Sequence, residues 1–451
     1  MDEELLATAA ARAIAYTRER DDRPVFPDSA AVEGLGAFVE PLPASGTDAH
    51  EVLEMLDVVG SPGTVVSGSG QYFGFVTGGT LPVGLAASWL VTAWDQNAAL
   101  GVMSPTAGVL DTVAGAWLVR LFGLPAGTQH TFVSGTSSAN AACLAAGRDR
   151  LLSDLGHDSV EDGIVGAPPL RVVVSEAAHS SVVKALGIVG LGRSAVVAVP
   201  ADEQGRLRPD ALPEAGEPTL VVLQAGNVNS GAFDPFEAVA EHFAGTPHWI
   251  HVDGAFGLWA AVSADRRPLT RGMDRAHSWA VDMHKWLNVS YDSAVAFVRD
   301  PADLARTYRV GASYLPDGAH LDPVHRGPDM SQRARAVETW AVLKHLGASG
   351  AEALIDRCCR HARTLGSRLA EAGFTVHNDV VLNQVMVSLD DDAETDRLLA
   401  AVAASGTMWA GGSEFNGRKV MRLSVSGWAA TDADIDAAAA TLIALADTSS
   451  D

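Results

Sequence analysis

An aspartate and a lysine at the ends of two apolar segments are the residues whose chemistry is easiest to specify. Asp253 closes the strand-like run HWIHVD, where a buried carboxylate is costly unless it meets a cation such as a protonated pyridine nitrogen. Lys285 lies in DMHKWLN, among apolar and aromatic neighbours that favour an imine between its amine and an aldehyde. Together they predict pyridoxal 5'-phosphate (PLP), with Lys285 as its anchor and Asp253 at its ring nitrogen.

A third segment, residues 130–150, has the pattern of an apolar strand, a turn of small residues and an Ala-rich helix. Backbone N–H groups at the helix start, with the hydroxyls of Thr136, Ser137 and Ser138, would form an anion site for the cofactor phosphate. An ordinary Ser/Thr helix cap has the same sequence pattern, so this segment alone does not distinguish a phosphate site from a helix cap. It lacks the spacing of a nucleotide P-loop or of a GxGxxG motif.

A fourth segment, SEAAHSSVVKAL, places His179 between a strand and a helix. An imidazole there could lie on the face of the cofactor ring and later act in proton transfer or carboxylate binding. The alternative is that His179 only caps the helix.

The elements that must position these residues alternate between β-branched runs and Ala-rich helical stretches. Strands are expected at 171–176, 219–224, 248–253 and 294–300, which predicts an α/β core with a mainly parallel sheet. Before it, residues 1–58 combine a helix (3–17) with Pro-rich linkers, as in an arm that packs on another lobe or subunit. The predicted division is therefore an arm (1–58), a large domain (59–315), a long loop that could be mobile (316–335) and a small α+β domain (336–451). In the small domain, helices are expected at 336–346 and 352–372, and strands at 385–390 and 419–426.

Composition excludes several kinds of partner. The formal net charge of −23 disfavours nucleic acids and anionic membrane surfaces. The most apolar stretch, 81–100, contains Trp94 and Asp95 and reads as a buried helix rather than a membrane span. The N-terminal residues do not resemble a secretion signal, so a cytoplasmic location is expected. Cys143, Cys358 and Cys359 have no zinc or redox spacing, and no metal is expected.

Several motifs follow one another in an order that resembles a known family. The chain resembles the group II PLP-dependent decarboxylases, the fold-type-I family that includes aromatic amino acid and glutamate decarboxylases. The resemblance runs from about Tyr72 to the C-terminus, through QYFGFVTGG, DQNAALGVMSP, SGTSSAN, AHSSVVKAL, GNVNSGAFDP, HVDGAF, DMHKWLN and MRLSVS. It implies a fold-type-I transferase fold with a seven-stranded sheet, a small C-terminal domain, and a homodimer with active sites at the subunit interface.

The same resemblance assigns roles to individual residues. Lys285 would form the internal aldimine, Asp253 would pair with the ring nitrogen, Ala255 would pack under the ring and His179 would stack on its other face. The phosphate would be surrounded by Thr136, Ser137, Ser138, Ser278 and His284. Asn227 would lie near the ring hydroxyl or the substrate carboxylate, and the substrate pocket would be shaped by Tyr72, Phe73 and Phe75.

Two departures from the family pattern concern the substrate and the final protonation. Ser69-Gly70 and Gln71 replace the His-Pro and basic residue that often precede the aromatic cluster. Aromatic amino acid decarboxylases carry a tyrosine in a mobile loop, whereas residues 316–335 contain none; the nearest substitutes are Tyr314, His320 and His325.

The expected reaction is α-decarboxylation of an L-amino acid to an amine through the Lys285 aldimine and a quinonoid. The alternatives on the same scaffold are oxidative deamination to an aldehyde, carbon–carbon bond cleavage and amino transfer. A non-catalytic regulatory subunit is disfavoured, because such a protein has no physical reason to keep Lys285, Asp253 and His179.

Overall fold

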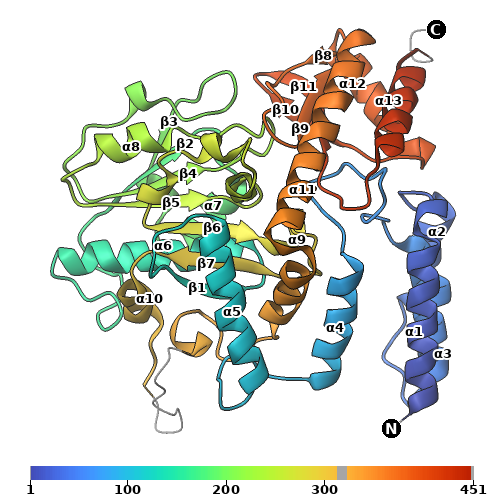
Figure 1. Ribbon diagram of the computed structural model, residues 1–451, viewed down its shortest axis with the longest axis horizontal. Coiled ribbons are helices and arrows are strands. Elements are labelled where there is room, and N and C mark those ends of the chain that lie inside the picture. Colours follow the sequence, from blue (N-terminus) through green and yellow to red (C-terminus); the bar gives the residue numbers. More distant parts are fainter. Residues whose placement is uncertain (1, 312–321, 448–451) are drawn as a thin grey trace. The chain divides into compact units, whose positions relative to one another are not determined.

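The computed structural model describes residues 2–311 and 322–447 of the chain (Figure 1). The chain divides into two compact units. Unit 1 comprises residues 1–77, 363–377 and 385–451, and unit 2 comprises residues 78–362 and 378–384.

Unit 2 is built on a seven-stranded sheet, which confirms the mainly parallel α/β fold expected. The strand order is β1-β7-β6-β5-β4-β2-β3. β7 runs antiparallel to both β1 and β6, while the other neighbouring strands are parallel. The strands are β1 (Gln129–Val133), β2 (Arg171–Ser175), β3 (Val196–Val199), β4 (Thr219–Gln224), β5 (His248–Asp253), β6 (Ser278–Asp282) and β7 (Ala294–Val298).

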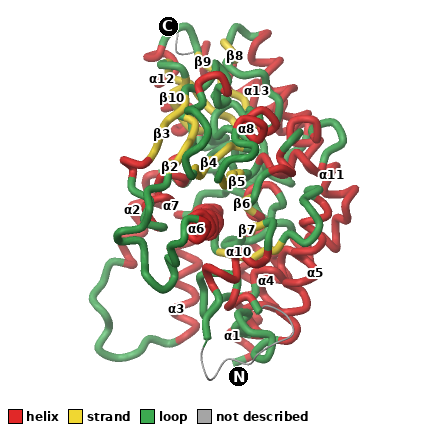
Figure 2. Tube along the Cα trace, turned by 90° about the vertical axis from the view of Figure 1, so that its left-hand side faces the viewer, coloured by secondary structure: helices red, strands yellow, loops and turns green. Residues whose placement is uncertain are grey.

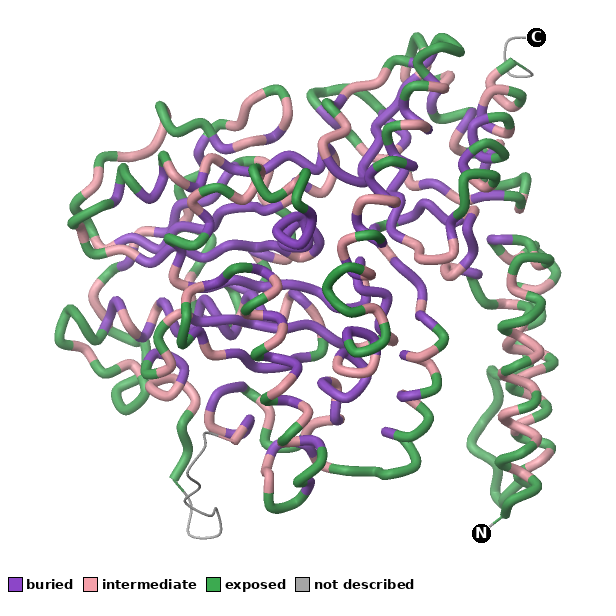
Figure 3. Tube along the Cα trace, in the orientation of Figure 1, coloured by how far each residue is buried: buried purple, intermediate pink, exposed green. Residues whose placement is uncertain are grey.

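Both faces of this sheet are covered, which is why its central strands read as continuous apolar runs. Along β7, Ala294, Ala296 and Val298 belong to the core formed with α6 (Thr136–Asp154). Phe297 points to the other face, where its ring lies 6.1 Å from that of Phe122, next to the end of α5 (Pro105–Leu121). The central strands are buried along nearly their whole length (purple in Figure 3), and α6 is seen nearly end-on beside them in Figure 2.

The two helices expected at 336–346 and 352–372 are both present, joined end to end within α11 (Arg335–Glu371), whose last residues belong to unit 1. Gly347 separates them, with a non-helical backbone whose φ of 63° favours glycine. In the predicted loop, Pro323–His325 form one 3-10 turn, whereas Tyr314 and His320 lie outside the described residues. The other helices are α4 (Pro82–Trp94), α7 (Ser180–Ile188), α8 (Phe236–His242), α9 (Met283–Trp286) and α10 (Pro301–Tyr308).

The expectation that residues 81–100 form a buried helix is wrong in part. The helix exists as α4, but only Gly84, Ala87 and Val91 are buried along it. Trp89, Leu90 and Trp94 are 40%, 54% and 42% exposed. A sequence pattern does not distinguish an apolar helix face that packs against the rest of the chain from one that is exposed for binding another molecule. None of the described helices is long and apolar enough to cross a membrane.

Unit 1 combines the N-terminal helices with a small sheet. Its four strands are ordered β10-β11-β9-β8. Among its described helices, α1, α2 and α3 contain no buried residue. The strands are β8 (Thr375–Val376), β9 (Gln384–Ser388), β10 (Gly411–Phe415) and β11 (Arg418–Ser424), and the helices are α1 (Glu3–Arg18), α2 (Ser29–Gly34), α3 (Ala49–Met55), α12 (Asp392–Ser405) and α13 (Asp432–Asp447).

The turn after β5 depends on the absence of a side chain at Gly257. A Cβ atom there would lie 2.1 Å from the carbonyl oxygen of Ala225, so two backbone segments would have to separate. We predict that Gly257→Ala lowers the free energy of unfolding by about 1–3 kcal/mol, measured by urea denaturation. Gly187→Ala is the matched control, because a Cβ in this turn of α7 meets nothing within 4 Å. Equal stabilities of the two variants would contradict the close approach.

Candidate active site

Three polar side chains end three neighbouring strands of the large sheet. Gln224, Asp253 and Asp282 are the last residues of β4, β5 and β6, which run parallel and adjacent to one another. Carboxyl ends of parallel strands meet at one edge, which is where α/β folds bind ligands. A cavity of about 230 Å³ opens at this edge. It is lined by Gly135, Thr136, Ser137, His179, Ser181, Gln224, Gly226, Val228, Asp253, Ala255, Phe256, Asp282 and Lys285.

Lys285 is carried into this cavity by the short helix α9, and Asp282 holds the start of that helix. The Asp282 Oδ1 atom accepts hydrogen bonds from the backbone N–H groups of His284 (2.8 Å) and Lys285 (3.2 Å). Its Oδ2 atom accepts one from the Thr136 hydroxyl at 3.2 Å. The Lys285 amine is half-buried and lies 6.0 Å from the centre of the Phe256 ring. Asp282 thus links the lysine to the first residue of α6.

Asp253 is a carboxylate that is only 6% exposed. Its Oδ2 atom accepts a hydrogen bond from Asn140 Nδ2 at 2.9 Å, and its Oδ1 atom accepts one from the Ala255 N–H at 3.2 Å. These bonds fix its orientation toward the cavity. Among the described residues it forms no ion pair, so a cationic ligand atom would complete its environment.

The start of α6 is open to an anion. Gly135 precedes the helix and provides no side-chain cap, and the first turn contains no acidic residue. Thr136 and Ser137 line the cavity at this point. Backbone N–H groups and the positive end of the helix dipole therefore face a ligand there, which suits a phosphate. The Ser138 hydroxyl is directed elsewhere, to Ser134 at 3.1 Å.

His179 and Gln224 contribute two more polar groups. His179 Nδ1 lies 2.7 Å from the Ser181 hydroxyl and accepts the Ser181 N–H at 3.2 Å, which fixes the ring at the start of α7. It is both a helix cap and part of the cavity lining. Gln224 is 4% exposed, and its Nε2 atom has no partner among the described residues. Its backbone N–H donates to the buried Asp234, whose pKa is raised to about 7 by burial.

Besides Ser138, three residues predicted near the cofactor do not line the cavity. Ser278 is fully buried at the opposite end of β6, bonded to Trp249 and His251. The Asn227 side chain organises its own turn by accepting the N–H groups of residues 229 and 230. His284 is buried beside the Lys285 backbone, where its Nδ1 atom lies 2.7 Å from the Val289 carbonyl oxygen and burial lowers its pKa.

His284 retains one unused polar atom. Its Nε2 atom is buried without a hydrogen-bond partner among the residues described. Its ring stacks on the exposed Tyr291, with centroids 3.4 Å apart. A Cβ added to Gly78 would lie 2.2 Å from the Lys285 carbonyl oxygen, so a glycine of the QYFGFVTGG motif packs directly on this helix.

The predicted substrate-pocket residues all belong to unit 1. Tyr72 and Phe73 are buried there, 9% and 1% exposed, whereas Phe75 is 65% exposed. The rings of Tyr72 and Phe75 stack on Trp409 with centroids 5.4 and 5.3 Å away. Phe75 has a φ of 54°, an uncommon conformation for a bulky residue that marks a constrained turn.

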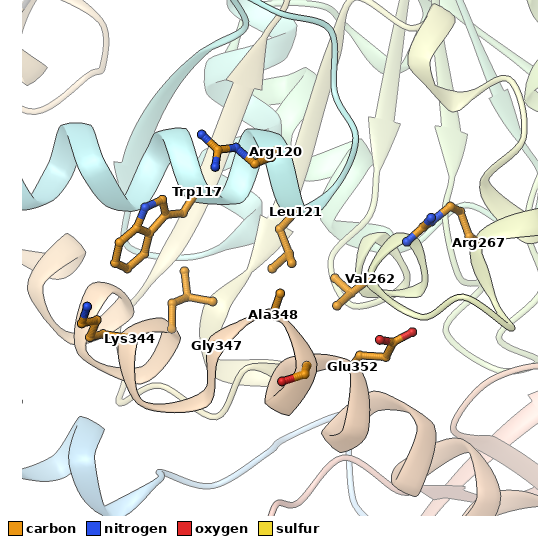
Figure 4. Close-up of a pocket in the computed structure, with 11 residues that line it drawn as sticks. Trp117, Arg120, Leu121, Val262, Arg267, Lys344, Gly347, Ala348 and Glu352 are labelled. Atoms are coloured by element: carbon orange, nitrogen blue, oxygen red, sulfur yellow. The ribbon is translucent and has the colours of Figure 1, made fainter.

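A larger pocket in unit 2 contains none of these groups. It encloses about 750 Å³, and Trp117 and Arg120 of α5 face Lys344 and Glu352 of α11 across it (Figure 4). Size therefore does not identify the active site, whereas the polar groups of the smaller cavity do. Within residues 2–311 and 322–447, no three His, Cys, Asp or Glu side chains gather closely enough to hold a metal ion.

The smaller cavity fits PLP. It offers a half-buried amine for an aldehyde, a buried carboxylate without a cation, and an open helix start for a phosphate. The unpartnered amide of Gln224 provides a further donor for a ring substituent. Sequence reasoning missed Gln224 and Asp282. Each is a polar residue at the end of a buried strand, which is the same signal that identified Asp253.

Comparisons with known proteins agree with this chemistry. The family profile described as the pyridoxal-dependent decarboxylase conserved domain matches residues 42–390. An aromatic-L-amino-acid decarboxylase of Bacillus atrophaeus is 26% identical over 348 residues, which cover 74% of this chain and 70% of that protein. An L-2,4-diaminobutyrate decarboxylase of Rhizobium meliloti is 31% identical over 337 residues, covering 72% of this chain and 66% of the relative.

The fold has close counterparts among solved structures. Mouse CSAD in its apo form superposes with a TM-score of 0.90 at 22% sequence identity, over 98% of both chains. This likeness concerns the fold alone, whereas the match of residues 42–390 to the family profile concerns the sequence itself. The chain belongs to the family of pyridoxal-dependent amino acid decarboxylases, whose cofactor is PLP.

Proposed function

We propose that this chain removes the α-carboxyl group of an L-amino acid as CO2 and forms an amine, with PLP held in the cavity at the carboxyl ends of β4, β5 and β6. The observation that carries the proposal is that Lys285, Asp253 and the open start of α6 share this one cavity. The family membership of the chain supports the same reaction.

When bound, PLP supplies an acceptor for the electron pair that remains on the α-carbon after CO2 leaves. The protein's part is to hold the ring and to place protons. In this proposal Asp253 would pair with the ring nitrogen, Ala255 would pack below the ring, and Thr136 and Ser137 would hold the phosphate together with the first N–H groups of α6. His179, whose orientation is fixed by Ser181, would lie on the other ring face.

Lys285 has two functions in this proposal. Its amine would anchor the cofactor and, when free, would serve as a base and an acid in the cavity. Its position is set by Asp282, which caps α9 through two backbone N–H groups. Phe75 is proposed to contact the substrate side chain, because its ring is exposed and is held by stacking on Trp409, which also stacks on Tyr72.

A labelling experiment tests this function. The protein loaded with PLP should absorb near 400 nm, lose that band on borohydride reduction, and carry the pyridoxyl group on Lys285. Lys285→Ala should lower CO2 release from the best amino acid substrate by more than about 100-fold, because it removes both the anchor and the proton carrier. Lys344→Ala is the control, since this exposed lysine lies outside the cavity.

The products decide between decarboxylation and its rivals. Amine and CO2 in equal amounts support the proposal. Aldehyde, ammonia and peroxide would replace it with the oxidative reaction, and a label on Lys184 or Lys419 would refute the assigned anchor.

We also propose that the active unit is a homodimer in the cytoplasm. On α4, Trp89, Leu90 and Trp94 expose large apolar side chains, and large apolar surfaces on a folded chain mark association sites. The predicted arm, residues 1–58, carries α1 to α3, which bury no residue within their own chain. The three cysteines are buried and unpaired, as expected in a reducing compartment.

Charge on the exposed face of α4 should separate the subunits. We predict that the double variant Trp89→Glu, Trp94→Glu weakens the dimer at least 100-fold, because aromatic anchors dominate the binding energy of protein interfaces. Sedimentation velocity across micromolar concentrations measures this. Val165→Glu is the control, since Val165 is 93% exposed on a loop between α6 and β2. A double variant that stays dimeric would exclude α4 from the interface.

A further inference from the structure

A chain of buried hydrogen bonds leads away from Asp253 into the core. Asn140 of α6 donates to Asp253, and its Oδ1 atom lies 2.9 Å from His251 Nε2. His251 Nδ1 lies 2.9 Å from the Ser278 hydroxyl, which accepts a hydrogen bond from Trp249 Nε1 at 2.9 Å. Asn140, His251 and Ser278 are fully buried, and Trp249 is 1% exposed.

With Asp253 ionised, every bond in this chain has one direction. A carboxylate can only accept, so Asn140 must present its N–H group to Asp253 and its oxygen to His251. His251 must then carry its proton on Nε2, which leaves Nδ1 as an acceptor. Ser278 can donate to that nitrogen while it accepts from the indole N–H of Trp249, which never accepts. All groups are satisfied with one tautomer of His251 and with Asp253 ionised.

The reversed chain requires a proton on Asp253. A protonated Asp253 would donate to the Asn140 oxygen, the Asn140 N–H group would face His251 Nε2, and His251 would carry its proton on Nδ1. The Nδ1–H of His251 would then bond to the hydroxyl or the backbone carbonyl of Ser278, and the Ser278 hydroxyl would have Cys143 as the acceptor for its own proton. Sulfur is a weak acceptor, so the reversed chain exchanges a good hydrogen bond for a poor one. Trp249 thus favours the direction in which Asp253 is ionised.

We propose that His251, through Asn140, is a positioning residue that keeps Asp253 ionised and thereby keeps the cofactor ring nitrogen protonated. This inference rests on the proposed role of Asp253 at that nitrogen. Burial lowers the pKa of His251 to about 4, so the ring is neutral at ordinary pH and can hold a defined tautomer. Trp249 is fixed in turn by α6, because a Cβ on Gly147 would lie 2.6 Å from its indole ring.

The tautomer can be measured without the cofactor. Solid-state 15N NMR of histidine-labelled apoprotein should place the His251 proton on Nε2, with His251→Gln used to assign the signal. A proton on Nδ1 would overturn the inference.

The link to the ring nitrogen needs protein reconstituted with 15N-labelled PLP. We expect His251→Phe to bind PLP about tenfold more weakly and to shift the ring nitrogen signal toward the unprotonated form, since a hydrogen bond that supports a charged group is lost. His251→Gln should restore both values, because its amide N–H can replace Nε2–H. A merely structural role predicts weaker binding with an unchanged nitrogen signal, and that result would refute the inference.

Failure of the underlying assignment has its own signature. If the wild-type protein carries PLP on Lys285 but its ring nitrogen is unprotonated, the proposed role of Asp253 is wrong, whatever the tautomer of His251.

Discussion

A buried carboxyl group at the end of β5 is the constraint on which the site depends. Transferring a carboxylate from water into a protein interior costs several kcal/mol unless donors and a cation surround it. Asp253 receives one donor from α6 and one from the turn that follows its own strand. The helix that covers the sheet and the turn at Gly254–Gly257 are therefore also the groups that make this charge tolerable.

The topology of the sheet explains why so few residues assemble the cavity. Because β4, β5 and β6 are parallel neighbours, their last residues meet at one edge of the sheet, although long crossover connections separate the strands in the sequence. β6 passes directly into the short helix that carries the lysine, and Asp282, its last residue, caps that helix. The same edge receives the starts of α6 and α7, so the groups for the amine, the ring and the phosphate come from five places in the sequence.

Much of this could be predicted from the sequence because the information is local. Strands buried on both faces read as apolar runs, so the limits of β4 and β5 agree with the predicted ones. Lys285 and Asp253 follow from the chemistry of their segments. Ser278 illustrates what local information lacks: it starts its strand far from the cavity edge and bonds to two residues of the neighbouring strand. The exposure of α4 could not be predicted from the sequence either, because a helix that is apolar around its whole circumference has the pattern of a buried core helix.

The exposed aromatic face of α4 has a consequence for how the protein should be handled. Burying Trp89 and Trp94 against a second copy would stabilise the folded state by mass action, so the melting temperature would rise with protein concentration. Stabilities of mutants would then be comparable only at matched protomer concentrations. Dilution would dissociate the copies and so lower the stability of the folded state.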